Sequence, residues 1–350
     1  MAHTPVYYGD YLQLEKLLDA QHPVSFTGPE KAHDEMLFVV IHQAYELWFK
    51  QILFELEAVN ATLEKPALND NSPELQTVVH RMKRIVTILK VLVHQIDIIE
   101  TMTPMDFLDF RDMLRPASGF QSWQFKVIEA RLGLKFEQRH GLHYYTSQLK
   151  EPEIEIIKNA EEQKSLIELV NAWLERMPFL DDDTYWKDAE PLTADFRVNG
   201  LPYFWQLYRH IYIKSLAEAE ANNAALFDKI FLADSEDRTL SAKAARAALF
   251  IFCYRGYPML ELPFQLLDTL LEIDNELGNW RSRHINMVRR MIGSRIGTGG
   301  STGAGYLQGA MDKHYIFKEI AQLNSFLIDR RKLPVLPGSL TALLGYHKMD

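Results

Sequence analysis

The pattern of apolar and polar positions is helical along most of the chain. Residues 35–65 carry apolar side chains on nearly every face, which predicts a long buried helix. Residues 75–102 repeat apolar positions along one face, which predicts a second long, amphipathic helix. No segment combines sustained strand alternation with hairpin turns. The pattern therefore predicts an all-α fold.

Capping residues predict where the next helix begins and ends. Thr103 can cap a helix that has Pro104 at its first position, and Asp106 stands where a capping box needs an acceptor. Pro116 should end this helix, because the residue before a proline avoids the α region. A further helix is predicted over 120–134.

The remaining pattern is helical with a less regular middle. Residues 135–150 are expected to form a loop, and helices are expected over 152–177, 201–230, 239–254, 263–293 and 305–328. The stretch 263–293 can be one long helix or two short ones. No repeat and no clear linker is visible, so we expect one all-α domain over 1–350, with room for a helical excursion at about 150–255.

Composition narrows the class of protein. The chain has 350 residues and is 47% hydrophobic, which is enough for a large core, and its net charge of −9 argues against a nucleic-acid partner. A single cysteine, Cys253, excludes an internal disulfide and fits a reducing compartment. We see no secretory signal and no apolar run near the roughly 20 residues that span a bilayer. A cytoplasmic protein without a membrane segment is expected.

His42 is the first candidate for chemistry. At helical spacing it shares a face with Phe38, Tyr45 and Phe49. A histidine among aromatic residues is usually a core residue with a satisfied ring nitrogen. The alternative is a histidine that points into an apolar cavity and makes one directed hydrogen bond.

Arg111 is the second candidate. It shares a helix face with Phe107 and Leu114, which predicts partial burial, and a buried guanidinium needs an anion. That anion can be an internal Asp or Glu. It can also be the carboxylate of a ligand, because the fork of arginine suits bidentate contact.

His284 lies late in a helix among basic residues and can be a surface histidine or an iron ligand. The chain has no H-E-x-x-H motif and no paired cysteines. A metal would therefore have to arrive with a cofactor that supplies most of its ligands. A porphyrin does so, and it needs one protein histidine and a large apolar slot.

The stretch GSRIGTGGSTGAGYL (293–307) is unusually rich in glycine. It lacks the lysine of a P-loop, and Thr302 stands where a dinucleotide fingerprint needs its third glycine. Two interpretations of this stretch remain, a flexible connection and a mobile loop with a function. Near the N-terminus, Tyr8 and Tyr11 taken alone are typical of packing residues at the start of a helix.

Several stretches together resemble the tryptophan 2,3-dioxygenase family. They include HDEMLFVVIHQAYELWFKQILFEL (33–56), IETMTPMDFLDFRDMLRPASGFQSWQF (99–125) and WRSRHINMVRRMIGSRIGTGGSTGAGYL (280–307), in family order. The resemblance implies an all-helical homotetramer with one haem b per chain. It also implies conversion of L-tryptophan and O2 to N-formyl-L-kynurenine, the first step of tryptophan catabolism by the kynurenine route.

The resemblance assigns roles to single residues. His284 matches the axial ligand of the haem iron. His42 matches the distal histidine that bonds the indole N–H, and Arg111 matches the residue that grips the substrate carboxylate. We expect His42 to position the substrate and not to act as an obligatory base, because the indole N–H is a weak acid.

Six further residues take supporting roles by the same resemblance. Phe38 and Phe107 match walls of the substrate pocket, and Thr298 matches a contact to the ammonium and carboxylate end of tryptophan. Tyr8 and Tyr11 match tyrosines that a neighbouring subunit contributes, and Trp280 is expected to pack near the haem. The glycine-rich stretch would then be a flap that closes over the substrate.

The chain departs from the family pattern at a few positions, including Trp123 and Arg115, and none of them removes a catalytic group. They leave two alternatives open. One is a related haem-dependent oxygenase that acts on a substituted indole or another aromatic amino acid. The other is a haem or tryptophan sensor without catalysis.

Overall fold

A computed structural model gives the structure of the chain. It describes all residues except 1–4, 67, 69–71, 137–138, 140–148, 188, 190, 194–195, 197, 199–200, 294, 298–308, 310–313 and 346–350. Every regular element within these described residues is an α- or 3-10 helix. The prediction of an all-α fold is confirmed.

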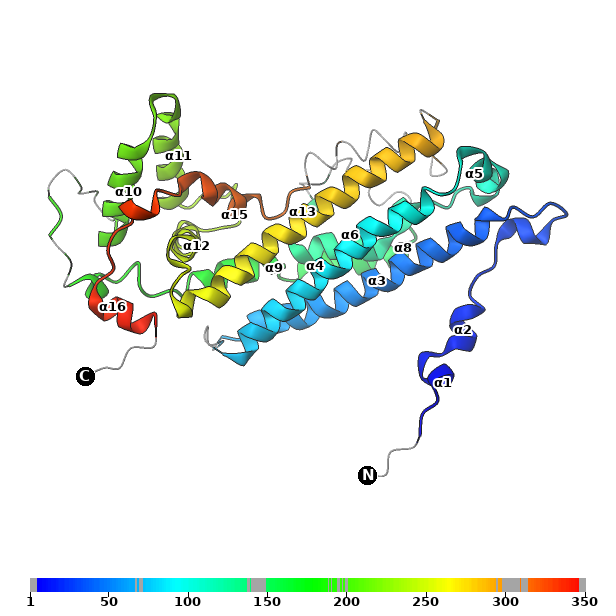
Figure 1. Ribbon diagram of the computed structural model, residues 1–350, viewed down its shortest axis with the longest axis horizontal. Helices are drawn as coiled ribbons and strands as arrows, with labels where there is room; N and C mark the ends of the chain where they lie inside the picture. Colours follow the sequence, from blue (N-terminus) through cyan, green and yellow to red (C-terminus); the bar gives the residue numbers. More distant parts are fainter. Residues whose placement is uncertain are drawn as a thin grey trace.

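Three long helices form the centre of the molecule. They are α3 (Asp34–Leu63), α4 (Pro73–Ile99) and α13 (Pro258–Ile292), and α4 packs against both of the others (Figure 1). α3 buries one face, which includes Phe49, Ile52 and Leu56. Its opposite face is exposed, so the prediction of a helix buried on all sides is wrong for the single chain.

Local capping explains where two of the helices begin. Ser72 accepts a hydrogen bond from the backbone N–H of Leu75 and is followed by Pro73, so α4 starts there. The predicted capping box at Thr103 and Asp106 is confirmed at the start of α5 (Pro104–Arg111). α5 is shorter than predicted, because the chain tightens into a 3-10 turn at Asp112–Leu114.

Shorter helices cover one end and one side of this centre. They are α6 (Trp123–Leu132), α8 (Glu151–Glu162), α9 (Leu166–Leu174), α10 (Tyr203–Ser215), α11 (Asn222–Phe231), α12 (Ala242–Tyr254), α15 (Lys318–Gln322) and α16 (Gly338–Leu343). The largest cluster of buried apolar side chains joins α9–α12 to α3, α4 and α13. Among the described residues, no helix is long and apolar enough to cross a bilayer.

Two predicted helices are each divided in two. The predicted helix 152–177 breaks between α8 and α9, where the carboxylate of Glu168 accepts the backbone N–H of Ser165 at 2.9 Å and its hydroxyl at 2.7 Å. This arrangement starts a new helix and gives the chain a corner. The predicted helix 201–230 likewise ends at Ser215 and restarts at Asn222 as α11.

The last two predicted helices also differ from the structure. α13 is a single helix that begins at Pro258, so Pro263, the predicted start, lies inside it. Of the predicted helix over 305–328, residues 305–308 and 310–313 lie outside the described residues. The prediction is wrong at 314–317, because the carboxylate of Asp274 accepts the backbone N–H groups of Ile316 and Phe317, at 3.1 and 2.6 Å. The helix starts only at Lys318 as α15.

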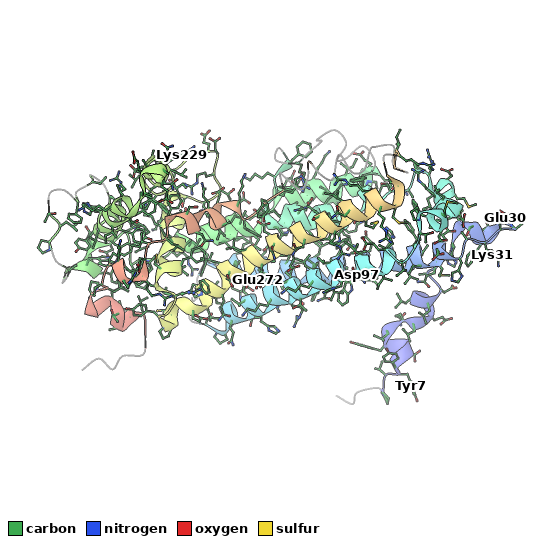
Figure 2. The ribbon with its side chains drawn as sticks, turned by 45° about the horizontal axis from the view of Figure 1, so that its top comes forward. Tyr7, Glu30, Lys31, Asp97, Lys229 and Glu272 are labelled. Carbon is green, nitrogen blue, oxygen red and sulfur yellow. The ribbon has the colours of Figure 1, made fainter. Side chains whose placement is uncertain are left out.

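The N-terminal arm, defined as residues 5–18 with α1 (Tyr8–Leu12) and α2 (Leu14–Leu18), projects from the body (Figures 1 and 2). Figure 2 shows Tyr7 near its tip. The side chains of Tyr8 and Tyr11 are 74% and 75% exposed, so the expectation that they pack at a helix start is wrong within one chain.

Candidate functional site

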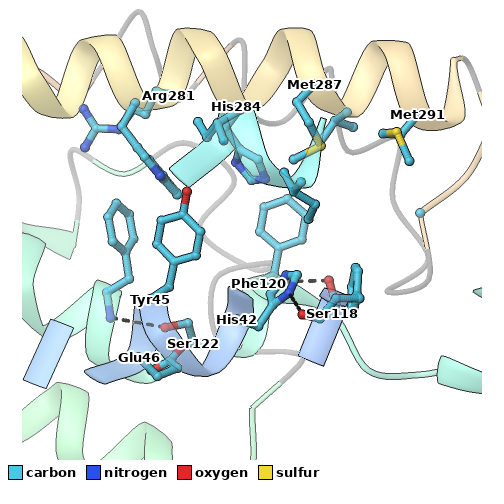
Figure 3. Close-up of a pocket in the computed structure, with 18 of the residues that line it drawn as sticks. His42, Tyr45, Glu46, Ser118, Phe120, Ser122, Arg281, His284, Met287 and Met291 are labelled. Carbon is cyan, nitrogen blue, oxygen red and sulfur yellow. Dashed lines mark hydrogen bonds between the residues drawn. The ribbon is translucent and has the colours of Figure 1, made fainter. Parts of the chain in front are cut away.

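A cavity of about 300 Å³ opens between α3, α5, α6 and α13. Most of its wall is apolar and aromatic, and a few polar groups point into it. Figure 3 shows His42 on the α3 wall and His284 on the α13 wall, with Met287 and Met291 further along α13. The two histidines that the sequence singled out therefore belong to one cavity.

His42 presents one free ring nitrogen to this cavity. Its Nδ1 donates to the backbone carbonyl of Phe38 at 2.7 Å, which leaves Nε2 as the acceptor. The ring is exposed because the cavity is open, yet the surrounding protein still lowers the pKa of His42 by burial, against the opposing carbonyl contact and the charge of Glu46. The neutral form of His42 is therefore favoured.

His284 lies on α13 and lines the cavity. Its buried Nδ1 has no hydrogen-bond partner among the described residues, and burial lowers its pKa to about 4. The ring of Trp280, one turn earlier, lies 5.0 Å from that of His284. A metal ligand must be a neutral imidazole, which the lowered pKa favours, and because His284 lines the cavity the prediction of a surface histidine is wrong.

Arg111 ends α5 at the cavity wall and is 5% exposed. Its Nη2 donates to the backbone carbonyl of Ile296, and its buried Nε has no partner. Within the described residues it pairs with no Asp or Glu, so the internal-anion alternative finds no support there. A buried guanidinium with donors to spare suits an incoming carboxylate.

Aromatic rings line the cavity between His42 and Arg111. The ring of Phe38 lies 4.1 Å from that of His42 and 5.8 Å from that of Phe107, with which it stacks. Phe110 meets both phenylalanines edge-on, at 5.5 and 5.4 Å. A flat apolar ring would find a preformed slot here.

The far end of the cavity holds a buried ion cluster. The carboxylate of Glu129 bonds Arg139 and Arg281 at 2.8 Å each and lies 3.3 Å from Nδ1 of His314. Burial alone would raise the pKa of Glu129, but the contact from His314 and the charges of Arg139 and Arg281 hold that pKa well below its usual value. Glu129 therefore stays ionised and orients its cationic partners.

Lys126 adds a further cation to this end of the wall. It is 7% exposed, it donates to the backbone carbonyl of Phe120, and burial lowers its pKa to about 8. Sequence reasoning missed Lys126, Glu129, Arg281 and His314. The available signal was spacing, since Lys126 and Glu129 lie one turn apart on α6 and Arg281 precedes His284 by one turn on α13.

The structure does not bring every predicted site residue to the cavity. Thr298 lies outside the described residues, so its role and the flap stay predictions, although Gly297 just before it lines the cavity. Tyr8 and Tyr11 lie on the projecting arm, away from the cavity of their own chain (Figure 1). The described residues form no cluster of three or more His, Cys, Asp or Glu that could hold a bare metal ion.

Comparison with known proteins identifies the family. Residues 1–327 match the family model described as Tryptophan 2,3-dioxygenase. The chain is 42% identical to the tryptophan 2,3-dioxygenase of Bdellovibrio bacteriovorus, over 99% of this chain and all of the relative. It is 43% identical to that of Alteromonas mediterranea over 98% of both chains, and 41% identical to that of Xenopus tropicalis over 96% of this chain and 86% of the relative. With its length covered almost completely and two opposed histidines in one cavity, the chain belongs to the tryptophan 2,3-dioxygenase family.

Proposed function

We propose that the chain is a haem-dependent dioxygenase that converts L-tryptophan and O2 to N-formyl-L-kynurenine, the first step of the kynurenine route. The single observation that carries the proposal is the cavity with the neutral imidazoles of His42 and His284 on opposite walls and the guanidinium of Arg111 at its rim. Family membership supports the same reaction.

The residues present fit a haem. His284 would hold the iron, since its lowered pKa keeps the imidazole neutral, and Trp280 packs beside that ring. Lys126 and Arg281 supply buried positive charge at the end of the cavity, where the acidic edge of the cofactor would be held. When bound, the haem supplies the activation of dioxygen.

Substrate recognition follows from the other end of the cavity. Tryptophan loses water from its charged head on entry, and leaving that head unpaired would cost several kcal/mol. Arg111 offers a carboxylate two donors, with Thr298 proposed to assist. The indole ring packs against the wall that Phe38 and Phe107 form, and its N–H meets the free Nε2 of His42.

His42 acts by position in this proposal. Its Nδ1–H is committed to the Phe38 carbonyl, so Nε2 can accept the indole N–H in one orientation only. The indole ring is thereby held at a fixed angle to the place where dioxygen reacts. Holding the reactants in this orientation contributes to the rate. No proton transfer from the indole nitrogen is needed.

Assembly completes the proposal. We propose a cytoplasmic homotetramer in which Tyr8 and Tyr11 reach the site of a neighbouring copy. Their exposure on a projecting arm supports this assignment, because the described part of the chain buries no residue of α1 or α2.

An absorption spectrum tests the proposed function. Reduced protein in air should show a haem band that changes when tryptophan is added, and oxygen should be consumed with formation of N-formylkynurenine. His284→Ala should lose tight haem retention, whereas the exposed control His94→Ala should keep it. Haem retention equal in both variants would refute the assignment of His284.

A further inference from the structure

Tyr45 lies on α3, almost one turn after His42, and lines the cavity. Its hydroxyl donates to the backbone carbonyl of Leu92 on α4 at 2.8 Å, so this side chain joins two of the three central helices. Figure 3 shows the ring of Tyr45 reaching from α3 toward α13, with the hydroxyl at its end. The proton of this hydroxyl is thus committed to α4, and the oxygen can still accept a hydrogen bond.

Trp280 is the residue of α13 that Tyr45 meets. The two ring centroids lie 6.4 Å apart in an edge-on arrangement. The ring of Phe125 on α6 lies 4.9 Å from that of Trp280, and the ring of His284 lies 5.0 Å from it. Rings from α3, α6 and α13 itself therefore surround Trp280, which contacts both Tyr45 and His284.

The indole N–H of Trp280 is close to the oxygen of Tyr45. Nε1 of Trp280 is buried and makes no hydrogen bond of good geometry with the described residues, which is unfavourable for a buried donor. Burial raises the pKa of Tyr45 to about 12, and the approach of the Trp280 N–H opposes part of this rise. The Tyr45 oxygen is therefore the acceptor that this N–H has within reach.

We propose that Tyr45 is a positioning residue: its oxygen accepts the N–H of Trp280, and the ring of Trp280 in turn fixes the orientation of the His284 imidazole. Imidazoles that bind metals are oriented by the groups around them. Nδ1 of His284 has no hydrogen-bond partner among the described residues, so packing against Trp280 is a restraint that this ring does have. This role rests on the proposed function, since it requires that His284 holds the haem iron.

Tyr45→Phe tests the role, because it removes the hydroxyl and keeps the ring. In the reduced, haem-loaded chain, it should shift or broaden the iron–histidine stretching band of the resonance Raman spectrum. Transfer of haem to excess apomyoglobin should become roughly fivefold faster, which corresponds to the loss of one hydrogen bond of about 1 kcal/mol. Trp280→Phe should change the band at least as much, and an unchanged band in that variant would overturn the proposal.

Tyr254→Phe on α12 is the matched control. The hydroxyl of Tyr254 also donates to a backbone carbonyl, that of Pro334 at 2.7 Å, but it does so in the core and outside the cavity lining. This variant should lower the free energy of unfolding in urea and leave the Raman band and the rate of haem transfer unchanged. If Tyr45→Phe behaved in the same way, Tyr45 would only stabilise the fold, and the proposal would be wrong.

A double-mutant cycle tests whether Tyr45 acts through Trp280. In a Trp280→Phe background, Tyr45→Phe should leave the band and the transfer rate nearly unchanged, because the group that Tyr45 positions is gone. Additive effects would show that Tyr45 acts on the cofactor by another route and would overturn the proposal. A wild type that binds no haem would refute the proposed function itself. A wild type that binds haem and oxidises tryptophan, but does not respond to Tyr45→Phe, would refute the role of Tyr45 alone.

Discussion

Replacing Arg111 with methionine should weaken the use of tryptophan far more than it disturbs the protein. Methionine has a similar reach and no charge. Removing one partner of a buried charge pair costs about 2–5 kcal/mol. Nη2 of Arg111 already donates to the Ile296 carbonyl. Weakening this hydrogen bond when the substrate binds should reduce the binding free energy that the carboxylate contributes by about 1 kcal/mol. We therefore expect a net loss of about 3 kcal/mol, which is a fall of roughly a hundredfold in kcat/KM.

Steady-state kinetics with tryptophan and with tryptamine, which lacks the carboxylate, isolates the contact. If Arg111 binds the carboxylate, Arg111→Met should depress kcat/KM for tryptophan about a hundredfold and leave the much lower value for tryptamine nearly unchanged. Arg115→Met is the control, because its side chain is 53% exposed and lies 3.3 Å from Asp112 at the surface. An equal loss for both substrates, or a change below twofold for tryptophan, would refute the reasoning.

The remaining predictions concern stability and charge. Burial lowers the pKa of His284 to about 4, so between that pH and about 6.5 the unfolded chain binds a proton that the folded chain does not. The free energy of unfolding should therefore decrease as the pH is lowered from about 6.5 to about 4, by up to about 3 kcal/mol. Urea unfolding of the haem-free chain should show this slope in the wild type and lose it in His284→Gln; equal slopes would contradict it. Glu129→Gln should destabilise the chain by about 3–5 kcal/mol, since it removes the carboxylate that Arg281 binds and one of the two carboxylates beside Arg139, the other being that of Glu161. Glu162→Gln on the exposed side of α8 is the control for urea unfolding, and a matching small effect in both would argue against the cluster. Because the pKa of His42 is lowered, its Nε2 should stay unprotonated between pH 7 and pH 6, and kcat should stay constant over this range. A decrease of kcat near pH 6.5 that disappears in His42→Gln would contradict this prediction.

Local signals predicted much of the fold. The capping box at Thr103 and the proline at the start of α5 act within one turn, so they can be read from neighbouring residues. The same rules misplaced the start of α13, because Pro258 and Pro263 both suit a first turn and only packing decides between them. The break at Ser165 had a capping signal too, but the apolar repeat on both sides concealed it.

The candidate site was predictable in part for a different reason. His42, Arg111 and His284 could each be singled out from their own helices, but every one had an ordinary alternative. The structure places all three on one cavity, which supports a binding role for each. Glu129 and His314 could not be found this way, since they are 185 residues apart in sequence and meet only after folding.

The backbone contact of His42 has a consequence for inhibitor design. A carbonyl of the same helix fixes which ring nitrogen carries the proton, so changes of side chain elsewhere cannot reverse it. A heterocycle that presents an N–H toward Nε2 should be matched at neutral pH, whereas its isostere with a bare nitrogen there would oppose two lone pairs. Paired compounds of this kind would read out the tautomer without altering the protein.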